Sequence, residues 1–171
     1  MKIIRLVPFV LCVTPMFAQS IERGQYLATV GGCGDCHTPK TASFAPDTAR
    51  LLSGSPSSAT TPSKPKKAGE VVSSAGSTAF YGPWGISYAA NLTPDPATGI
   101  LKEYTEASFI HAMRTGKTPD GGNILPPMPW ENYGKMTDDD LKSLWAYLHS
   151  LKPVKNKVKP PVRAAKTKPS A

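Results

Sequence analysis

The stretch Cys33-Gly34-Asp35-Cys36-His37 decides how the rest of the chain is interpreted. It has the C-x-x-C-H pattern by which a c-type haem is attached. Two thiols at this spacing add to the two vinyl groups of the porphyrin, and the adjacent imidazole becomes the proximal ligand of the iron. Thiol–disulfide redox pairs and half of a zinc site share the C-x-x-C spacing. The histidine that follows at once, and the lack of a second cysteine pair in the sequence, favour covalent attachment of one haem.

The first residues have the pattern of a secretory signal peptide. Lys2 and Arg5 precede a short apolar run over residues 6–13, and Ala18 is a small residue at the expected cleavage site. The run is too short to span a bilayer, which takes about 20 apolar residues. We therefore expect a signal peptide over residues 1–18, cleaved after Ala18, and a soluble protein exported to the periplasm. A buried N-terminal helix is the alternative.

The positive charge is concentrated outside the expected core of the domain. The 171 residues include 20 Lys and Arg against 12 Asp and Glu, a net charge of +8. Basic residues without any acid follow residue 151: Lys152, Lys155, Lys157, Lys159, Arg163, Lys166 and Lys168. The remainder is nearly balanced, so we expect no nucleic-acid binding. We predict a basic disordered tail over 154–171 that acts as a solvated spacer, with weak contact to an anionic membrane surface or an acidic partner as the alternative.

A second segment of unusual composition interrupts the domain predicted for residues 19–153. Residues 53–77 are mostly Ser, Thr, Pro, Ala, Gly and Lys, with Val71 and Val72 as the large apolar residues. Such a composition buries too little apolar surface to offset the entropy lost on ordering. We predict a disordered insertion there.

The remaining pattern is helical. Three segments show apolar residues at helical spacing after a Ser or Thr cap: 20–30, 105–116 and 137–151. The fold class expected is therefore all-α, a small helical domain wrapped around one covalent haem. Gly24, in the first of these segments, either allows another helix to approach closely or is simply a tolerated glycine.

The sixth ligand of the iron is predicted to be Met128. It lies between Pro127 and Pro129, which restrict the backbone and allow a thioether to be held toward an iron atom. The imidazole of His37 is expected to donate its other N–H to a backbone carbonyl in the loop after Pro39. Packing or surface roles are assigned to the other candidates: Met113, Met136, His111 and His149.

Several short motifs together resemble a known family. They occupy residues 23–27, 33–39, 91–95, 98–100, 112–116, 127–129 and 146–151. The chain resembles class I cytochromes c, and more narrowly the modules in the multi-haem cytochrome subunits of bacterial membrane-bound alcohol and gluconate dehydrogenases. The resemblance implies His37 and Met128 as axial ligands and packing of the N- and C-terminal helices against each other. Those relatives carry three haem motifs and a membrane anchor, whereas this sequence has one motif and an additional segment, 53–77.

The function expected from these features is electron transfer rather than catalysis. The haem c held by Cys33 and Cys36 would cycle between Fe(II) and Fe(III) with His37 and Met128 as axial ligands. Expected partners are redox proteins: a dehydrogenase on one side and an oxidase or another cytochrome on the other. The alternative is a haem protein with an open sixth position that binds a small ligand or acts as a peroxidase.

Overall fold

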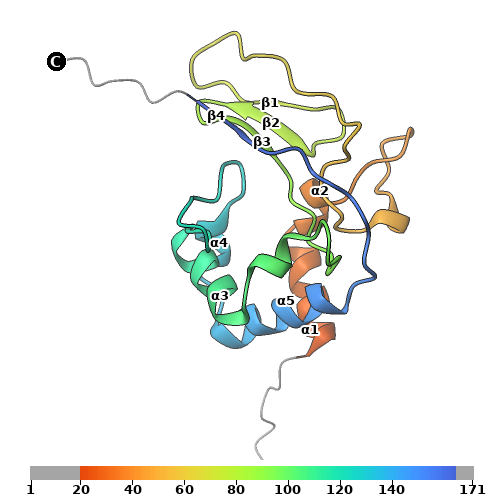
Figure 1. Ribbon diagram of the computed structural model, residues 1–171, viewed down its shortest axis with the longest axis vertical. Coiled ribbons are helices and arrows are strands. Elements are labelled where there is room, and N and C mark those ends of the chain that lie inside the picture. Colours follow the sequence, from red (N-terminus) through yellow and green to blue (C-terminus); the bar gives the residue numbers. More distant parts are fainter. Residues whose placement is uncertain (1–19, 165–171) are drawn as a thin grey trace, which may run out of the picture.

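The computed structural model describes residues 20–164, with helices on one side of the domain and a small sheet on the other (Figure 1). The predicted signal peptide, residues 1–18, lies outside the described residues, as does 165–171. The helices are α1 (Ile21–Val30), α2 (Cys33–His37), α3 (Glu106–Thr115), α4 (Trp130–Tyr133) and α5 (Asp138–Ser150), with 3₁₀ turns at Thr48–Arg50 and Ile100–Glu103. Within residues 20–164, no helix has the length and apolar character needed to cross a membrane.

The three helices predicted from the sequence are confirmed, together with their caps. The Ser20 hydroxyl accepts a hydrogen bond from the backbone N–H of Arg23 at 2.9 Å, which begins α1. Thr105 and Ser108 form a reciprocal capping box at the start of α3. Thr137 accepts from the backbone N–H of Asp140 at 3.1 Å and begins α5.

Helices α1 and α5 cross at Gly24, and this explains the glycine. A Cβ atom at position 24 would overlap the backbone carbonyl of Ser143 and the Cβ of Tyr147, both on α5. The two helix backbones therefore approach as closely as they do only because residue 24 has no side chain. Beneath this crossing, Leu141, Leu144 and other apolar residues form the buried core.

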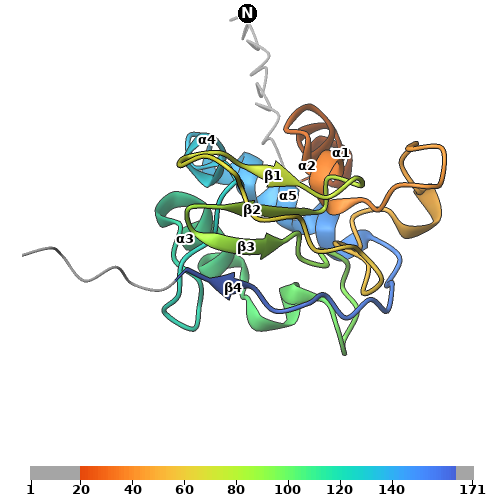
Figure 2. The same ribbon diagram turned by 90° about the horizontal axis from the view of Figure 1, so that it is seen from above.

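The prediction of an all-α fold is wrong, because a four-stranded antiparallel sheet covers the opposite side of the domain (Figure 2). Its strands run in chain order: β1 (Val72–Ser73), β2 (Ala79–Gly82), β3 (Gly85–Tyr88) and β4 (Val162–Arg163). A two-residue turn joins β2 to β3 and leaves Gly82 opposite Gly85. The outer strands contain two residues each, which is too short to give a period-two pattern in the sequence.

Residues 53–77, predicted as a disordered insertion, begin inside the domain. Ser53 and Ser55 are buried, and the backbone N–H of Gly54 donates to the carbonyl of His37 at 2.7 Å. The segment ends by supplying β1, whose Val72 pairs with Tyr81 of β2. The prediction is wrong for both ends of the segment, because backbone hydrogen bonds rather than apolar side chains hold them to the domain.

The first part of the tail, predicted to be disordered, is instead bound to the domain by hydrogen bonds. We call residues 153–164 the strap, because they run from the end of α5 along the domain to β4 (Figure 1). Asn91, which is 1% exposed, donates from its side-chain amide to the carbonyl of Val154 at 2.8 Å. The side-chain amide of Asn156 donates to the carbonyls of Ser53 and Ser55 at 2.7 and 2.9 Å. The strap therefore fastens the start of the 53–77 segment to the domain.

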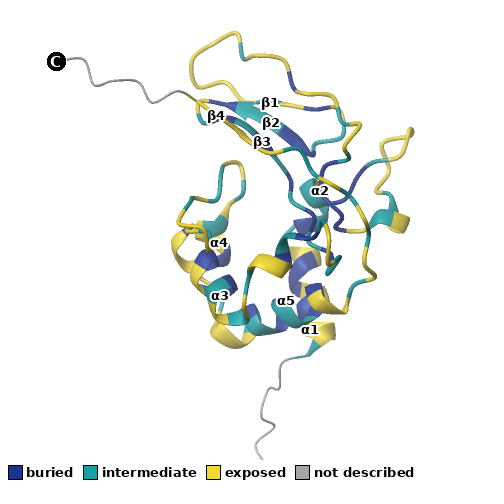
Figure 3. Cartoon of the chain, viewed as in Figure 1, coloured by how far each residue is buried: buried dark blue, intermediate teal, exposed yellow. Residues whose placement is uncertain are grey.

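Burial follows this division of the chain (Figure 3). The buried apolar side chains gather where α1, α3 and α5 meet. Outside these helices, the buried set includes many small polar residues: Thr38, Ser53, Ser55, Ser74, Thr78, Ser87, Asn91 and Thr93. Between the two sides lies the candidate site.

Candidate haem site

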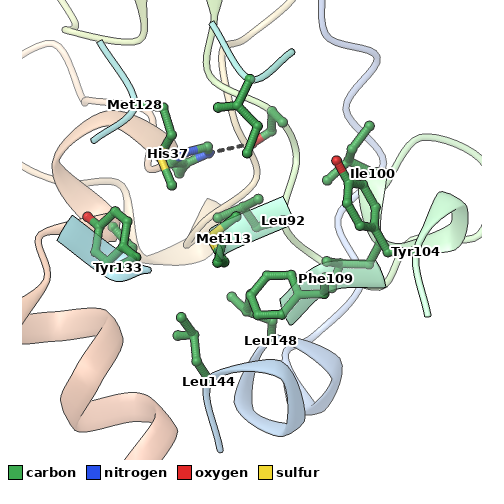
Figure 4. A pocket seen from close by; sticks show the side chains of 14 residues that line it. His37, Leu92, Ile100, Tyr104, Phe109, Met113, Met128, Tyr133, Leu144 and Leu148 are labelled. Atoms are coloured by element: carbon green, nitrogen blue, oxygen red, sulfur yellow. Dashed lines mark hydrogen bonds between the residues drawn. The ribbon is translucent and has the colours of Figure 1, made fainter. Parts of the chain in front are cut away.

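A cavity of about 700 Å³ lies between the helices and the sheet. It continues at its base into an apolar pocket of about 130 Å³, drawn in Figure 4. The walls of the pocket are formed mainly by apolar side chains from several elements: Leu92, Ile100, Leu101, Phe109, Met113, Ile124, Leu144 and Leu148. In Figure 4, His37 and Met128 lie at one end of this pocket and Leu144 and Leu148 at the other. The volume of the larger cavity, about 700 Å³, lies within the usual range of cofactor sites, about 300–1,000 Å³.

Both cysteines of the C-x-x-C-H motif are carried by α2 and line the cavity. Cys33 is buried and Cys36 is half-buried, and both are free thiols. Burial raises the pKa of the Cys33 thiol to about 11 and also raises that of Cys36, so both sulfurs are neutral at pH 7. Gly32 begins α2 in the left-handed conformation, with φ +69°, which favours glycine.

The C-terminal end of α2 is closed by one ammonium group. The side chain of Lys40 donates to the carbonyls of Gly34, Asp35 and Thr38, at 3.3, 3.0 and 3.1 Å. A cation at a helix C-terminus satisfies carbonyls that have no partner within the helix. These bonds fix the short helix that carries both cysteines.

The orientation of His37 is set by the backbone of Ala90. Its Nδ1 lies 2.8 Å from the Ala90 carbonyl oxygen, and since a carbonyl can only accept, Nδ1 must carry the proton (Figure 4). Removal of the ring from water lowers the pKa of His37, and the bond to Ala90 opposes this shift. In the neutral ring, Nε2 then keeps a free lone pair. The expectation of a partner in the loop after Pro39 is wrong, because Ala90 follows β3.

Met128 lines the same cavity from the loop that joins α3 to α4. That loop is tied to the sheet: the Ser87 hydroxyl donates to the carbonyl of Pro126 at 2.6 Å. Ser87 in turn accepts a hydrogen bond from the indole N–H of Trp84 at 3.2 Å. The sheet therefore holds the backbone two residues before Met128.

The other methionines and histidines have the following positions. Met113 is buried on α3 and packs in the core as predicted, but it also lines the pocket, so two thioethers border it. Met136 is partly buried against the core. His111 and His149 are exposed on α3 and α5.

The donor set and the cavity fit a c-type haem. Two thiols lie on one short helix, and the imidazole that follows them keeps a free nitrogen. A thioether from a separate loop borders the same cavity, whose base is almost entirely apolar. An apolar macrocycle with axial nitrogen and sulfur ligands requires these features.

Sequence reasoning missed three contributors to this site. The Ala90 carbonyl is a backbone group, so its role does not depend on the side chain and cannot be inferred from the residue type. Ser87 anchors the methionine loop from a distance of 39 residues along the chain. Arg163, which also lines the cavity, lies in a segment whose composition resembles that of a disordered tail.

Comparison with known proteins confirms the resemblance expected from the sequence. The chain is 33% identical over 142 residues to the cytochrome c subunit of the quinone alcohol dehydrogenase of Gluconacetobacter polyoxogenes, covering 82% of this chain and 24% of the relative. It is 35% identical over 136 residues to the fructose dehydrogenase cytochrome subunit of Gluconobacter japonicus, covering 79% and 22%. It is 32% identical over 135 residues to the gluconate 2-dehydrogenase cytochrome c subunit of Pantoea cypripedii, covering 78% and 24%.

These relatives are much longer than the chain. Each match spans about a quarter of the relative and about four-fifths of this chain. No protein-family model matches. Over most of its length, the chain thus resembles a single module of these cytochrome c subunits.

Proposed function

We propose that this chain is an electron-transfer protein of the cytochrome c type. One haem would be attached through Cys33 and Cys36, with His37 and Met128 as axial ligands. The observation that carries the proposal is the apolar cavity bordered by all of these side chains. When bound, a c-type haem supplies one-electron chemistry at its iron, which cycles between Fe(II) and Fe(III). We assign no substrate chemistry to the chain.

The residues around the cavity have distinct tasks in this proposal. The Ala90 carbonyl keeps the proton on Nδ1 of His37, which orients the ring and makes Nε2 a better ligand. Ser87 restrains the loop of Met128. The apolar side chains at the base of the cavity exclude water. With both axial ligands held in this way, the coordination of the iron would change little between Fe(II) and Fe(III). Such a site suits a protein that only transfers electrons.

A dehydrogenase is the proposed electron donor. The support is that similar chains are named as cytochrome subunits of alcohol, fructose and gluconate dehydrogenases. An oxidase or another cytochrome would accept the electron, and the site of action would be the periplasm. We expect weak, partly electrostatic docking, as is usual for transient redox partners.

Exposed lysines on and next to the strap offer a surface for an acidic partner or an anionic membrane. Lys152, Lys155 and Lys157 are all exposed. Each cation near an anionic lipid surface contributes about 1 kcal/mol. Replacing all three by Gln should weaken sedimentation with anionic vesicles and leave the strap in place. Unchanged sedimentation would remove this role.

The haem assignment is tested by the mass of the protein after expression with haem-attachment machinery. The intact protein should gain the mass of one haem, and the double variant Cys33→Ala/Cys36→Ala should gain none. A colourless wild-type protein of unmodified mass would contradict the proposal.

The sixth ligand is tested by comparing two methionines that border the same pocket. Met128→Leu should give a visible spectrum that lacks methionine ligation and should bind carbon monoxide in the reduced state. Met113→Leu is the matched control, and it should keep the wild-type spectrum. The reverse result would transfer the ligand role to Met113.

A further inference from the structure

The charged groups around the cavity are unequal in number. Among the described residues that line it, Arg163 is the only lysine or arginine. The acidic residues in the lining are Asp35, Glu103 and Asp120. A single cation beside three acids needs an explanation, since a porphyrin with carboxylate substituents would meet unfavourable charges there.

Arg163 is brought to the cavity by the strap. It pairs with Gly85 across the β3–β4 ladder, and the backbone N–H of Ala164 donates to the Trp84 carbonyl at 2.9 Å. Its guanidinium extends toward the loop between α3 and α4, where a Cβ at Gly122 would lie 3.5 Å from Nη2. Within residues 20–164, Arg163 forms no ion pair.

The nearest acid in that loop already has partners. The Asp120 carboxylate accepts hydrogen bonds from the Thr118 hydroxyl and from the backbone N–H of Gly122. These bonds lower the pKa of Asp120, and the charge of Arg163 adds to the effect. Arg163 therefore has donors to spare for another anion.

The chemistry of the cofactor identifies that anion. A haem carries its two vinyl groups and its two propionates on opposite edges, and α2 would hold the vinyl edge. In both views of the molecule, β4 lies away from α2, on the side of the loop between α3 and α4 (Figures 1 and 2). A carboxylate moved out of water is destabilised unless it is paired, and the guanidinium fork matches carboxylate geometry.

We propose that Arg163 binds a propionate of the haem and that the strap is the device which delivers it. The inference rests on the proposed function, since it requires the haem. The guanidinium keeps the propionate ionised and, as a nearby positive charge, disfavours the additional charge of Fe(III). Removing it should therefore lower the reduction potential when the propionate is ionised.

The pH dependence gives a more specific signature. Without Arg163 the pKa of the propionate rises, so protonation compensates for the lost cation as the pH falls. The potential of Arg163→Gln should then vary with pH near neutrality, where the wild type is flat. Other groups that face this region are Glu103, Asp120, whose pKa the hydrogen bond from Thr118 lowers, and Tyr104, whose pKa burial raises.

The experiment is a spectroscopic redox titration of the haem-loaded full chain between about pH 5 and pH 9, a range that includes carboxyl pKa values raised by burial. Arg163→Gln should show a lower potential at alkaline pH and a pH-dependent potential near neutrality, and Arg163→Lys a smaller change of the same sign. Lys157→Gln removes the same charge from a strap position that does not line the cavity, and it should follow the wild type.

Two outcomes would overturn the inference. In the first, Arg163→Gln and Lys157→Gln give the same potentials at every pH. In the second, Arg163→Lys matches Arg163→Gln although both variants keep their haem and the wild-type unfolding temperature. Absence of covalent haem from the wild type would instead contradict the proposed function, so the two failures are distinguishable.

Discussion

The helices and the sheet that face each other across the cavity are held by different forces. On the helical side, α1 and α5 cross at Gly24, and apolar side chains such as Leu141 and Leu144 fill the space beneath. On the sheet side, buried Asn91 fixes the strap by a hydrogen bond, and Asn156 of the strap fixes the start of the 53–77 segment. The stability of the helical side follows from the apolar area that it buries, whereas that of the sheet side depends on a few specific hydrogen-bond donors.

This difference has a functional counterpart. The helical side supplies the apolar base of the cavity, with Phe109 and Leu148. The sheet side supplies groups that orient: the Ala90 carbonyl on His37, Ser87 on the methionine loop, and Arg163 at the opening. Changes on the helical side should therefore act on folding alone, whereas changes to the orienting groups on the sheet side should also alter the properties of the haem.

The largest effect is expected at the helix crossing. Gly24→Ala places a methyl group on the Ser143 carbonyl and should destabilise the protein by about 3 kcal/mol, the upper part of the range for overpacking. Thermal unfolding followed by circular dichroism measures it. Gly76→Ala is the control, since the nearest atom there is 4.0 Å away. Equal unfolding temperatures for the two variants would mean that the crossing is not tightly packed.

The strap should be released by one polar substitution. Asn91→Ala removes the shorter hydrogen bond to the Val154 carbonyl and leaves the buried backbone N–H of Thr93 without its partner, which costs about 2 kcal/mol. Limited proteolysis should then cleave within residues 153–164, while exposed Asn132→Ala behaves as wild type. Protection of the strap in Asn91→Ala would show that other contacts suffice.

A smaller change is expected when the methionine loop loses its anchor. Ser87→Ala removes the donor to the Pro126 carbonyl and should cost about 1 kcal/mol. Reduced haem-loaded protein should also bind carbon monoxide more readily, because Met128 is displaced more easily. The control is Ser73→Ala, an exposed position on β1. Identical carbon monoxide binding in both variants would show that Ser87 has no part in positioning Met128.

The smallest effect concerns an ion pair at the surface of the helix crossing. Arg23 lies 2.9 Å from Asp140, and this partner lowers the pKa of the Asp140 carboxyl. The pair therefore stabilises the protein above the ordinary carboxyl pKa, about 3.9, and this contribution is lost as the pH falls through the lowered value. Wild type and Arg23→Gln should differ slightly in unfolding temperature at pH 7 and converge in acid. A difference independent of pH would exclude the pair as its source.

The helical side was predictable because its signals are local. The caps at Ser20, Thr105 and Thr137 lie within three residues of their partners, and the apolar faces follow the helical period. The C-x-x-C-H motif is local as well. These features identify the helices and the attachment residues from the sequence alone.

The sheet side was not predictable for the opposite reason. Asn91 and Val154 are 63 residues apart, and Ser87 and Pro126 are 39 apart. Segments rich in Ser, Pro and Lys predict disorder because they bury little apolar surface, yet here polar groups of the domain hold them. The role of Arg163 follows only once β4 is known to pair with β3.

The most direct test of the account is the visible spectrum of the purified protein, oxidised and reduced, with carbon monoxide added to the reduced form. If His37 and Met128 both ligate the iron, the reduced spectrum is low-spin and carbon monoxide leaves it unchanged. A spectrum shifted by carbon monoxide would mean an open sixth position. Ligand binding or peroxidase chemistry, rather than electron transfer alone, would then be the better description of the site.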